Sequence, residues 1–165
     1  MTSGKSGDQA RVSVLVRVPP DEAFRVFTEE IDQWWRQGLR YRVGRGRSVI
    51  HLEPRAGGRL FESIGDGARV IETGRVTAWE PPARLAFEWR AVNFAPTEKT
   101  DVEVLFAPSP SGTLVTVRHG GWSRIRPDHP ARHGLEVAPF IGNLGMWWAD
   151  LMTSLRLHAA GHSRE

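Results

Sequence analysis

Alternation of apolar and polar residues is the dominant pattern of this chain of 165 residues. Valines occupy every second position from Val12 to Val18. Leu85, Phe87 and Trp89 repeat this spacing in the middle of the chain. Side chains alternate between the two faces of a β-strand, so the spacing places these bulky residues on one face. We therefore predict strands with one apolar face, which must be covered by a helix, by an apolar ligand or by both.

Turn-forming residues separate seven predicted strands. These are Arg11–Val18, Ser48–Glu53, Arg59–Ile64, Arg69–Trp79, Leu85–Val92, Thr100–Ala107 and Thr113–His119. The segments between the later strands contain residues that fix or permit turn geometry, as in Gly65-Asp66-Gly67. Consecutive strands joined by short turns predict an antiparallel meander.

Two regions have helical spacing instead. Pro19 and Pro20 end the first strand, and apolar residues then recur at Phe24, Phe27 and Ile31, which predicts a short helix or helix pair from Pro20 to Arg36. Near the end of the chain, one apolar stripe predicts a long helix over residues 140–160. Its members are Phe140, Ile141, Leu144, Trp148, Leu151, Leu155 and His158.

Three motifs carry a family resemblance: EPRAGGRLFE (53–62), GRVTAWEPPARLAFEW (74–89) and VTVRHGGW (115–122). Together with the adjacent Trp34 and Trp35 and the late apolar helix, they resemble the SRPBCC, or START-like, superfamily, and most closely its bacterial branch of homologues of the activator of heat-shock protein 90 ATPase. The resemblance spans about residues 11–160. It implies an α+β helix-grip fold, in which a curved antiparallel sheet wraps around the C-terminal helix. We expect a disordered leader over residues 1–10 and a single domain over residues 11–162.

A cavity between the curved sheet and the straight helix is the expected consequence of this fold, with a typical ligand-pocket volume of about 300–1,000 Å³. The alternative for each aromatic residue is plain core packing. The expected lining residues are Trp35, Leu60, Glu62, Phe87, Trp89, Val104, Val117, Trp122 and Trp148.

Three polar residues are candidates for proton transfer in this cavity. Counting by two from Leu60 places Glu62 on the inner face, and the same alternation allows Glu72 and His119 to point inward. A carboxylate among aromatic rings is costly unless it is paired, hydrogen-bonded or protonated. The alternative for Glu62 is a side chain that reaches solvent or pairs with an arginine, and the alternative for Glu72 and His119 is a structural role.

The composition of the chain bears on which chemistry and which partners are possible. The chain has no cysteine, which excludes disulfides and thiolate chemistry, and its net charge of +3 is modest. An arginine cluster with Tyr41 in its midst would suit nucleic acid, but we interpret it as a solvated surface and expect no nucleic-acid partner. The cluster consists of Arg36, Arg40, Arg42, Arg45 and Arg47.

Metal and cofactor sites are not expected. His129 and His133, and again His158 and His162, are four residues apart, but neither pair has an evident third ligand of the kind zinc needs. The glycine pair at Gly44 and Gly46 lacks the third glycine of a nucleotide-binding fingerprint. The polar N-terminus has no signal-peptide core, and no apolar run is long enough to span a bilayer, so we expect a cytoplasmic protein.

Three functions therefore remain open. The first is a binding protein for a lipid-like, aromatic or polyketide-like small molecule, apolar or amphipathic. The second is an enzyme of the cyclase or dehydratase type, as some relatives in the superfamily are. The third, suggested by the family name, is a chaperone-associated adaptor. A homodimer is compatible with the resemblance.

Overall fold

The computed structural model describes residues 8–44, 47–90 and 94–162. Its strands are β1 (Ala10–Val16), β2 (Ser48–Leu52), β3 (Arg59–Ile64), β4 (Arg69–Glu80), β5 (Arg84–Trp89), β6 (Thr100–Ser109) and β7 (Gly112–Gly120). Its α-helices are α1 (Pro20–Glu29), α2 (Ile31–Trp34) and α3 (Val137–His162). Two short 3-10 helices, Trp122–Arg124 and Pro130–Arg132, lie between β7 and α3.

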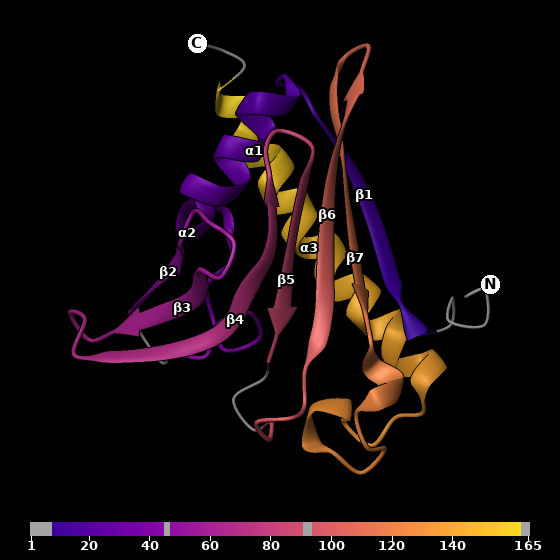
Figure 1. Ribbon diagram of the computed structural model, residues 1–165. Coiled ribbons are helices and arrows are strands. Elements are labelled where there is room, and N and C mark those ends of the chain that lie inside the picture. The colour runs from indigo at the N-terminus through magenta and orange to yellow at the C-terminus, as the bar shows by residue number, and fades with distance from the viewer. Residues whose placement is uncertain (1–7, 45–46, 91–93, 163–165) are drawn as a thin grey trace.

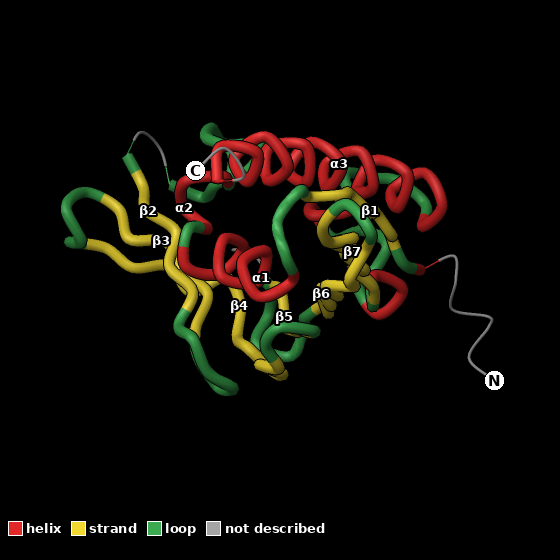
Figure 2. The backbone as a smooth tube through the Cα atoms, turned by 90° about the horizontal axis from the view of Figure 1, so that it is seen from above, coloured by secondary structure: helices red, strands yellow, loops and turns green. Residues whose placement is uncertain are grey.

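All described strands form one antiparallel seven-stranded sheet, in the order β1-β7-β6-β5-β4-β3-β2. The sheet is strongly curved, and α3 runs along the inside of the curve beside β1 (Figure 1). Seen from above, the strands form an arc around α1 and α3 (Figure 2). This arrangement confirms the predicted helix-grip fold, including two short helices after the first strand.

Predicted and observed element boundaries agree closely. β1 begins at Ala10, one residue before the predicted start, and Ala10 pairs with His119. Residues 1–7 of the predicted leader and the predicted strand end at Val92 lie outside the described residues. The C-terminal helix begins at Val137, three residues before its predicted start, because Pro139 falls in the first turn, where a missing N–H costs nothing.

The apolar stripe of α3 packs into the main core, as the helical spacing predicts. Trp148, Leu151 and Leu155 are almost completely buried. Phe140 is also buried, whereas Leu144 is half-buried. Trp148, Leu151 and Leu155 pack with the inward valines of the sheet and with Phe24 and Phe27 of α1, whereas Phe140 packs in a second apolar cluster. The valines of the main core are Val16, Val76, Val102, Val104, Val115 and Val117.

A β-bulge in β4 overturns the predicted direction of Glu72. Leu60 pairs with Gly74 while its neighbour Phe61 pairs with Glu72, so Thr73 is the extra residue of β4. Thr73 is buried, and Glu72 therefore lies exposed in an ion pair with Arg75 at 2.6 Å. Simple alternation does not count the extra residue, so the inward prediction for Glu72 is wrong.

Gly74, which follows the extra residue, permits a close approach of β4 to β5. A Cβ atom on Gly74 would lie 2.3 Å from the carbonyl oxygen of Glu88 in the neighbouring strand β5. Only glycine permits so close an approach of two backbones. The bulge places Thr73 on the inner face beside Leu60, where its hydroxyl donates to the Leu60 carbonyl oxygen at 3.3 Å.

Candidate functional site

An aromatic cluster occupies the space between the sheet and the middle of α3. The ring of Trp35 lies at its centre, stacked 6.1 Å from Trp89 of β5. It meets Trp147 and Trp148 of α3 edge-on, each at 5.8 Å between ring centroids. Tyr41 stacks on Trp147 at 5.9 Å. We call these five residues the aromatic cluster; offset and edge-to-face pairs of this kind stabilise beyond their buried area.

A small hollow lies beside this cluster. Its volume is about 10 Å³, which is room for about one water molecule and far below the volume of a typical ligand pocket. The rings of the aromatic cluster occupy the space that the curvature of the sheet leaves beneath α3. The hollow is lined by Trp35, Tyr41, Ile50, Leu60, Glu62, Thr73 and Trp89.

The predicted lining residues fall into three groups. The structure brings Trp35, Leu60, Glu62 and Trp89 together around the hollow. It places Phe87, Val104, Val117 and Trp148 in the packed main core. Trp122 lies in a second apolar cluster, where its ring is 4.5 Å from that of Phe140.

Glu62 points inward from β3, as alternation predicts, and only 4% of it is exposed. Its carboxylate accepts two backbone hydrogen bonds, from the N–H of Val43 at 2.7 Å and from the N–H of Gly44 at 3.0 Å. Charge-assisted bonds of this kind offset the cost of burying a carboxylate. Glu62 therefore fastens the segment after α2 to the sheet, next to the hollow.

Arg42 fastens the same segment from the other side, and it corrects the interpretation of the arginine cluster as wholly solvated. Its side chain is only 1% exposed and forms an ion pair with Asp32 at 2.6 Å. It also donates to the carbonyl groups of Asp32, Trp35, Arg36 and Ser48. Arg36, Arg40 and Arg47 are exposed as predicted, and Arg45 lies outside the described residues.

Residues 36–44, which we call the covering segment, also bind α3. Trp147 Nε1 donates to the carbonyl oxygen of Arg40 at 2.7 Å, and the Tyr41 hydroxyl donates to Asp150 at 3.0 Å. Burial and the hydrogen bond to Asp150 raise the pKa of Tyr41, so this phenol is neutral and can donate. The covering segment thus links β3 to α3 across the aromatic cluster.

His119 is buried at the inner end of the cluster, and both ring nitrogens are occupied. Trp148 Nε1 donates to Nδ1 at 3.0 Å, and His119 Nε2 lies 2.8 Å from the Thr100 hydroxyl. Thr100 itself donates to the carbonyl oxygen of Trp89 at 3.2 Å, so its oxygen accepts the Nε2–H of His119. Burial lowers the pKa of His119 to about 3, and the ring is neutral.

Replacing Glu62 with glutamine should lower the free energy of unfolding by about 1.5–3 kcal/mol, because an amide NH₂ would face one of two backbone N–H donors. Urea unfolding at pH 7 measures this loss. The control is Glu72→Gln, the same change on the exposed face of the sheet, for which we expect less than about 0.5 kcal/mol. Equal effects of the two substitutions would show that the bonds to Val43 and Gly44 contribute little.

The fold and the inward-facing aromatic cluster define a helix-grip protein of the START-like class. Residues 17–139 match the family model described as activator of Hsp90 ATPase homolog 1-like protein, and the chain belongs to this family. No curated protein matches the sequence.

Solved structures with the same fold cover nearly the whole chain. Protein MLL2253 from Mesorhizobium loti is 22% identical with a TM-score of 0.62, over 90% of this chain and 94% of its own. Protein SA2116 from Staphylococcus aureus is 14% identical with a TM-score of 0.65, over 95% of this chain and 96% of its own. At these sequence identities, the two similarities show that the proteins share a fold.

A third structure has higher sequence identity. Txn09, described as an anthrahydroquino-gamma-pyrone synthase and complexed with a compound designated SUM, is 29% identical to the chain. The match covers 80% of this chain and 83% of Txn09, with a TM-score of 0.51.

The predicted lining residues did not include Tyr41, Ile50, Thr73 and Trp147, and Arg42 was not predicted to be buried. Arg42 stood among exposed arginines, and nothing in its local pattern distinguished the one that is buried. Thr73 lines the hollow only because of the bulge; Gly74 was the local signal, since a glycine inside a strand often marks one.

Proposed function

We propose that this protein binds an apolar or aromatic small molecule between the concave face of the sheet and α3, at the aromatic cluster. The observation that carries the proposal is the convergence of Trp35, Trp89, Trp147 and Tyr41 beside a hollow, with one buried carboxylate at its wall. Membership of a family with this fold supports it, and so does the resemblance to Txn09, whose structure is described as a complex.

Binding requires the hollow to enlarge, and the composition of α3 favours movement at its N-terminal half. Gly142 and Gly145 lie inside the helix, and each costs about 1 kcal/mol of helix stability relative to alanine. Neither glycine has a neighbour within 4 Å of the position of a Cβ, so packing does not require them. Trp147, in the next turn, is only half-buried. A ligand that displaces the ring of Trp147 would stack against Trp35 and Trp89.

An enzyme of the cyclase type is the second candidate, which the printed description of Txn09 as a synthase favours. Glu62 and Tyr41 are the titratable residues among those that line the hollow. Both already have hydrogen-bond partners: Glu62 accepts from the backbone N–H groups of Val43 and Gly44. Tyr41 donates to Asp150. His119 is likewise engaged on both nitrogens. These contacts favour ligand binding over acid–base catalysis.

The predicted homodimer and the predicted cytoplasmic location stay predictions.

A planar hydroxyanthraquinone such as emodin is a suitable probe for the binding site. We expect it to quench the tryptophan fluorescence saturably, and Trp89→Leu to weaken its binding about tenfold, since a lost ring stack of roughly 1.4 kcal/mol corresponds to that factor. The control is Trp79→Leu, which removes another half-buried tryptophan; its ring meets Phe24 edge-on and does not line the hollow. Equal affinity in the wild type and both variants would contradict the proposed site. Turnover of the probe would favour the enzyme instead.

A further inference from the structure

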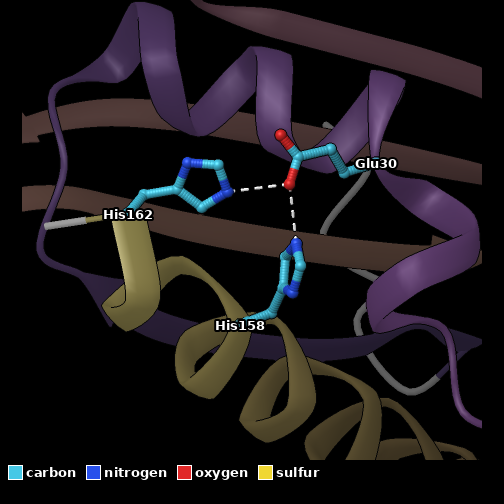
Figure 3. Close-up of side chains that lie close together, drawn as sticks. All are labelled: Glu30, His158 and His162. Carbon is cyan, nitrogen blue, oxygen red and sulfur yellow. Dashed lines mark hydrogen bonds and ion pairs between the residues drawn. The ribbon is translucent and has the colours of Figure 1, made fainter. Parts of the chain in front are cut away.

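A second polar cluster lies at the far end of α3, where its last turn meets the junction of α1 and α2. His158 and His162 project from α3 toward Glu30, the residue between the two short helices (Figure 3). The Nε2 atoms of both histidines donate to the same oxygen of Glu30, each at 2.7 Å. The relevant nitrogen and oxygen atoms of all three side chains lie within 4.8 Å of one another.

The geometry of this cluster suits a metal ion. Histidines four residues apart on a helix lie on one face, which is how helical zinc sites present two imidazoles. A tetrahedral ion with ligands at about 2.0–2.2 Å holds the ligand atoms roughly 3.4 Å apart. The contacts of 2.7 Å would lengthen by less than about 1 Å, which side-chain rotation alone provides.

The charges around the cluster also suit a cation. Both histidines donate to one oxygen of the Glu30 carboxylate, so Glu30 presents its negative charge to the two imidazoles. A carboxylate oxygen of Glu22 lies 3.6 Å from Nδ1 of His162. In metal sites, a carboxylate in this position orients the histidine that binds the metal through its other nitrogen. Arg25 is a nearby positive charge, 3.9 Å from the other oxygen of Glu30.

We propose that Glu30, His158 and His162 bind a divalent transition-metal ion of the zinc type, with water in the remaining position. Two imidazoles and one carboxylate favour Zn²⁺, Co²⁺ or Ni²⁺ over Mg²⁺ and Ca²⁺, which prefer oxygen ligands. The ion would join the last turn of α3 to the α1–α2 junction and hold the end of the helix in place. The third ligand, Glu30, is 128 residues from His158 in the sequence, so the histidine spacing alone predicted no site.

The test is titration calorimetry of the full chain with ZnCl₂, after removal of any histidine tag and treatment with a chelator. We expect one Zn²⁺ per chain and a melting temperature that rises with the Zn²⁺ concentration, while Mg²⁺ has no effect. His158→Ala, His162→Ala and Glu30→Gln should each weaken binding at least about tenfold. The control is His133→Asn, an exposed histidine in a left-handed backbone conformation that asparagine tolerates, and it should bind like the wild type.

A wild-type protein that binds no Zn²⁺ would overturn the proposal, and so would ligand variants that bind as tightly as the wild type. A measurement on the wild type alone covers the case in which a variant does not fold. Zn²⁺ should protect His158 and His162, but not His133, from carbethoxylation by diethylpyrocarbonate. If Zn²⁺ did not reduce the modification of His158 and His162 relative to that of His133, this result would also contradict the site.

Discussion

Replacing Arg42 with methionine should lower the free energy of unfolding by about 3–5 kcal/mol. The guanidinium is almost fully buried and is bound to Asp32 and to backbone carbonyl groups on both sides of the covering segment. Methionine fills much of the same volume but donates no hydrogen bond. The buried carbonyl oxygens of Trp35 and Ser48 would lose this donor, and an unsatisfied buried polar group costs about 1–3 kcal/mol.

Urea unfolding at pH 7 measures the loss, and two further variants identify its cause. Arg40→Met makes the same change in the same segment on a side chain that is 64% exposed, and should alter stability by less than about 0.5 kcal/mol. Arg42→Lys keeps the charge but not the planar fork that reaches several acceptors, so we expect an intermediate loss. If Arg42→Lys were as stable as the wild type, charge alone would account for the role of Arg42.

The fold could be predicted because its elements follow local rules. Alternating valines in β1, the turn residues Gly65-Asp66-Gly67 and the apolar stripe of α3 each determine one element without reference to distant residues. Gly65 and Asp66 have φ angles of 60° and 59°, left-handed values that glycine and aspartate adopt more readily than most residues. The family resemblance then supplied the order in which these elements pack.

The site could be predicted only in part, because its remaining features depend on long-range placement. The bulge at Thr73 turned Glu72 outward, and no local pattern gave its position beyond the glycine that follows. The burial of Arg42 depends on acceptors that only the folded chain brings together. The predicted cavity followed from backbone curvature, whereas the volume that remains depends on how Trp35, Trp89 and Trp147 pack, which residue spacing does not determine.

His119 should make the stability of the protein fall steeply in mild acid. In the unfolded chain its pKa is near 6.5, whereas burial lowers the pKa in the folded state to about 3. Below pH 6.5 the unfolded chain therefore binds a proton that the folded protein does not, so the contribution of His119 is complete above pH 6.5 and declines toward pH 3. The full loss is on the order of 5 kcal/mol, of which about 2–3 kcal/mol should be lost between pH 7 and pH 4.5.

Comparison with His119→Gln isolates this contribution from that of the carboxylates, which titrate in both proteins. Glutamine can accept from Trp148 and donate to Thr100, but it does not titrate. We expect urea unfolding to show a decrease between pH 7 and pH 4.5 that is smaller in the variant by about 2–3 kcal/mol. The imidazole resonances of His119 should also stay unchanged down to about pH 4 in NMR spectra. A midpoint near pH 6.5, or equal pH dependence in the two proteins, would show that water reaches His119 and that the interior beneath α3 opens readily. That outcome would weaken the case for His119 as a fixed neutral link between Trp148 and Thr100, and would favour a more open ligand site.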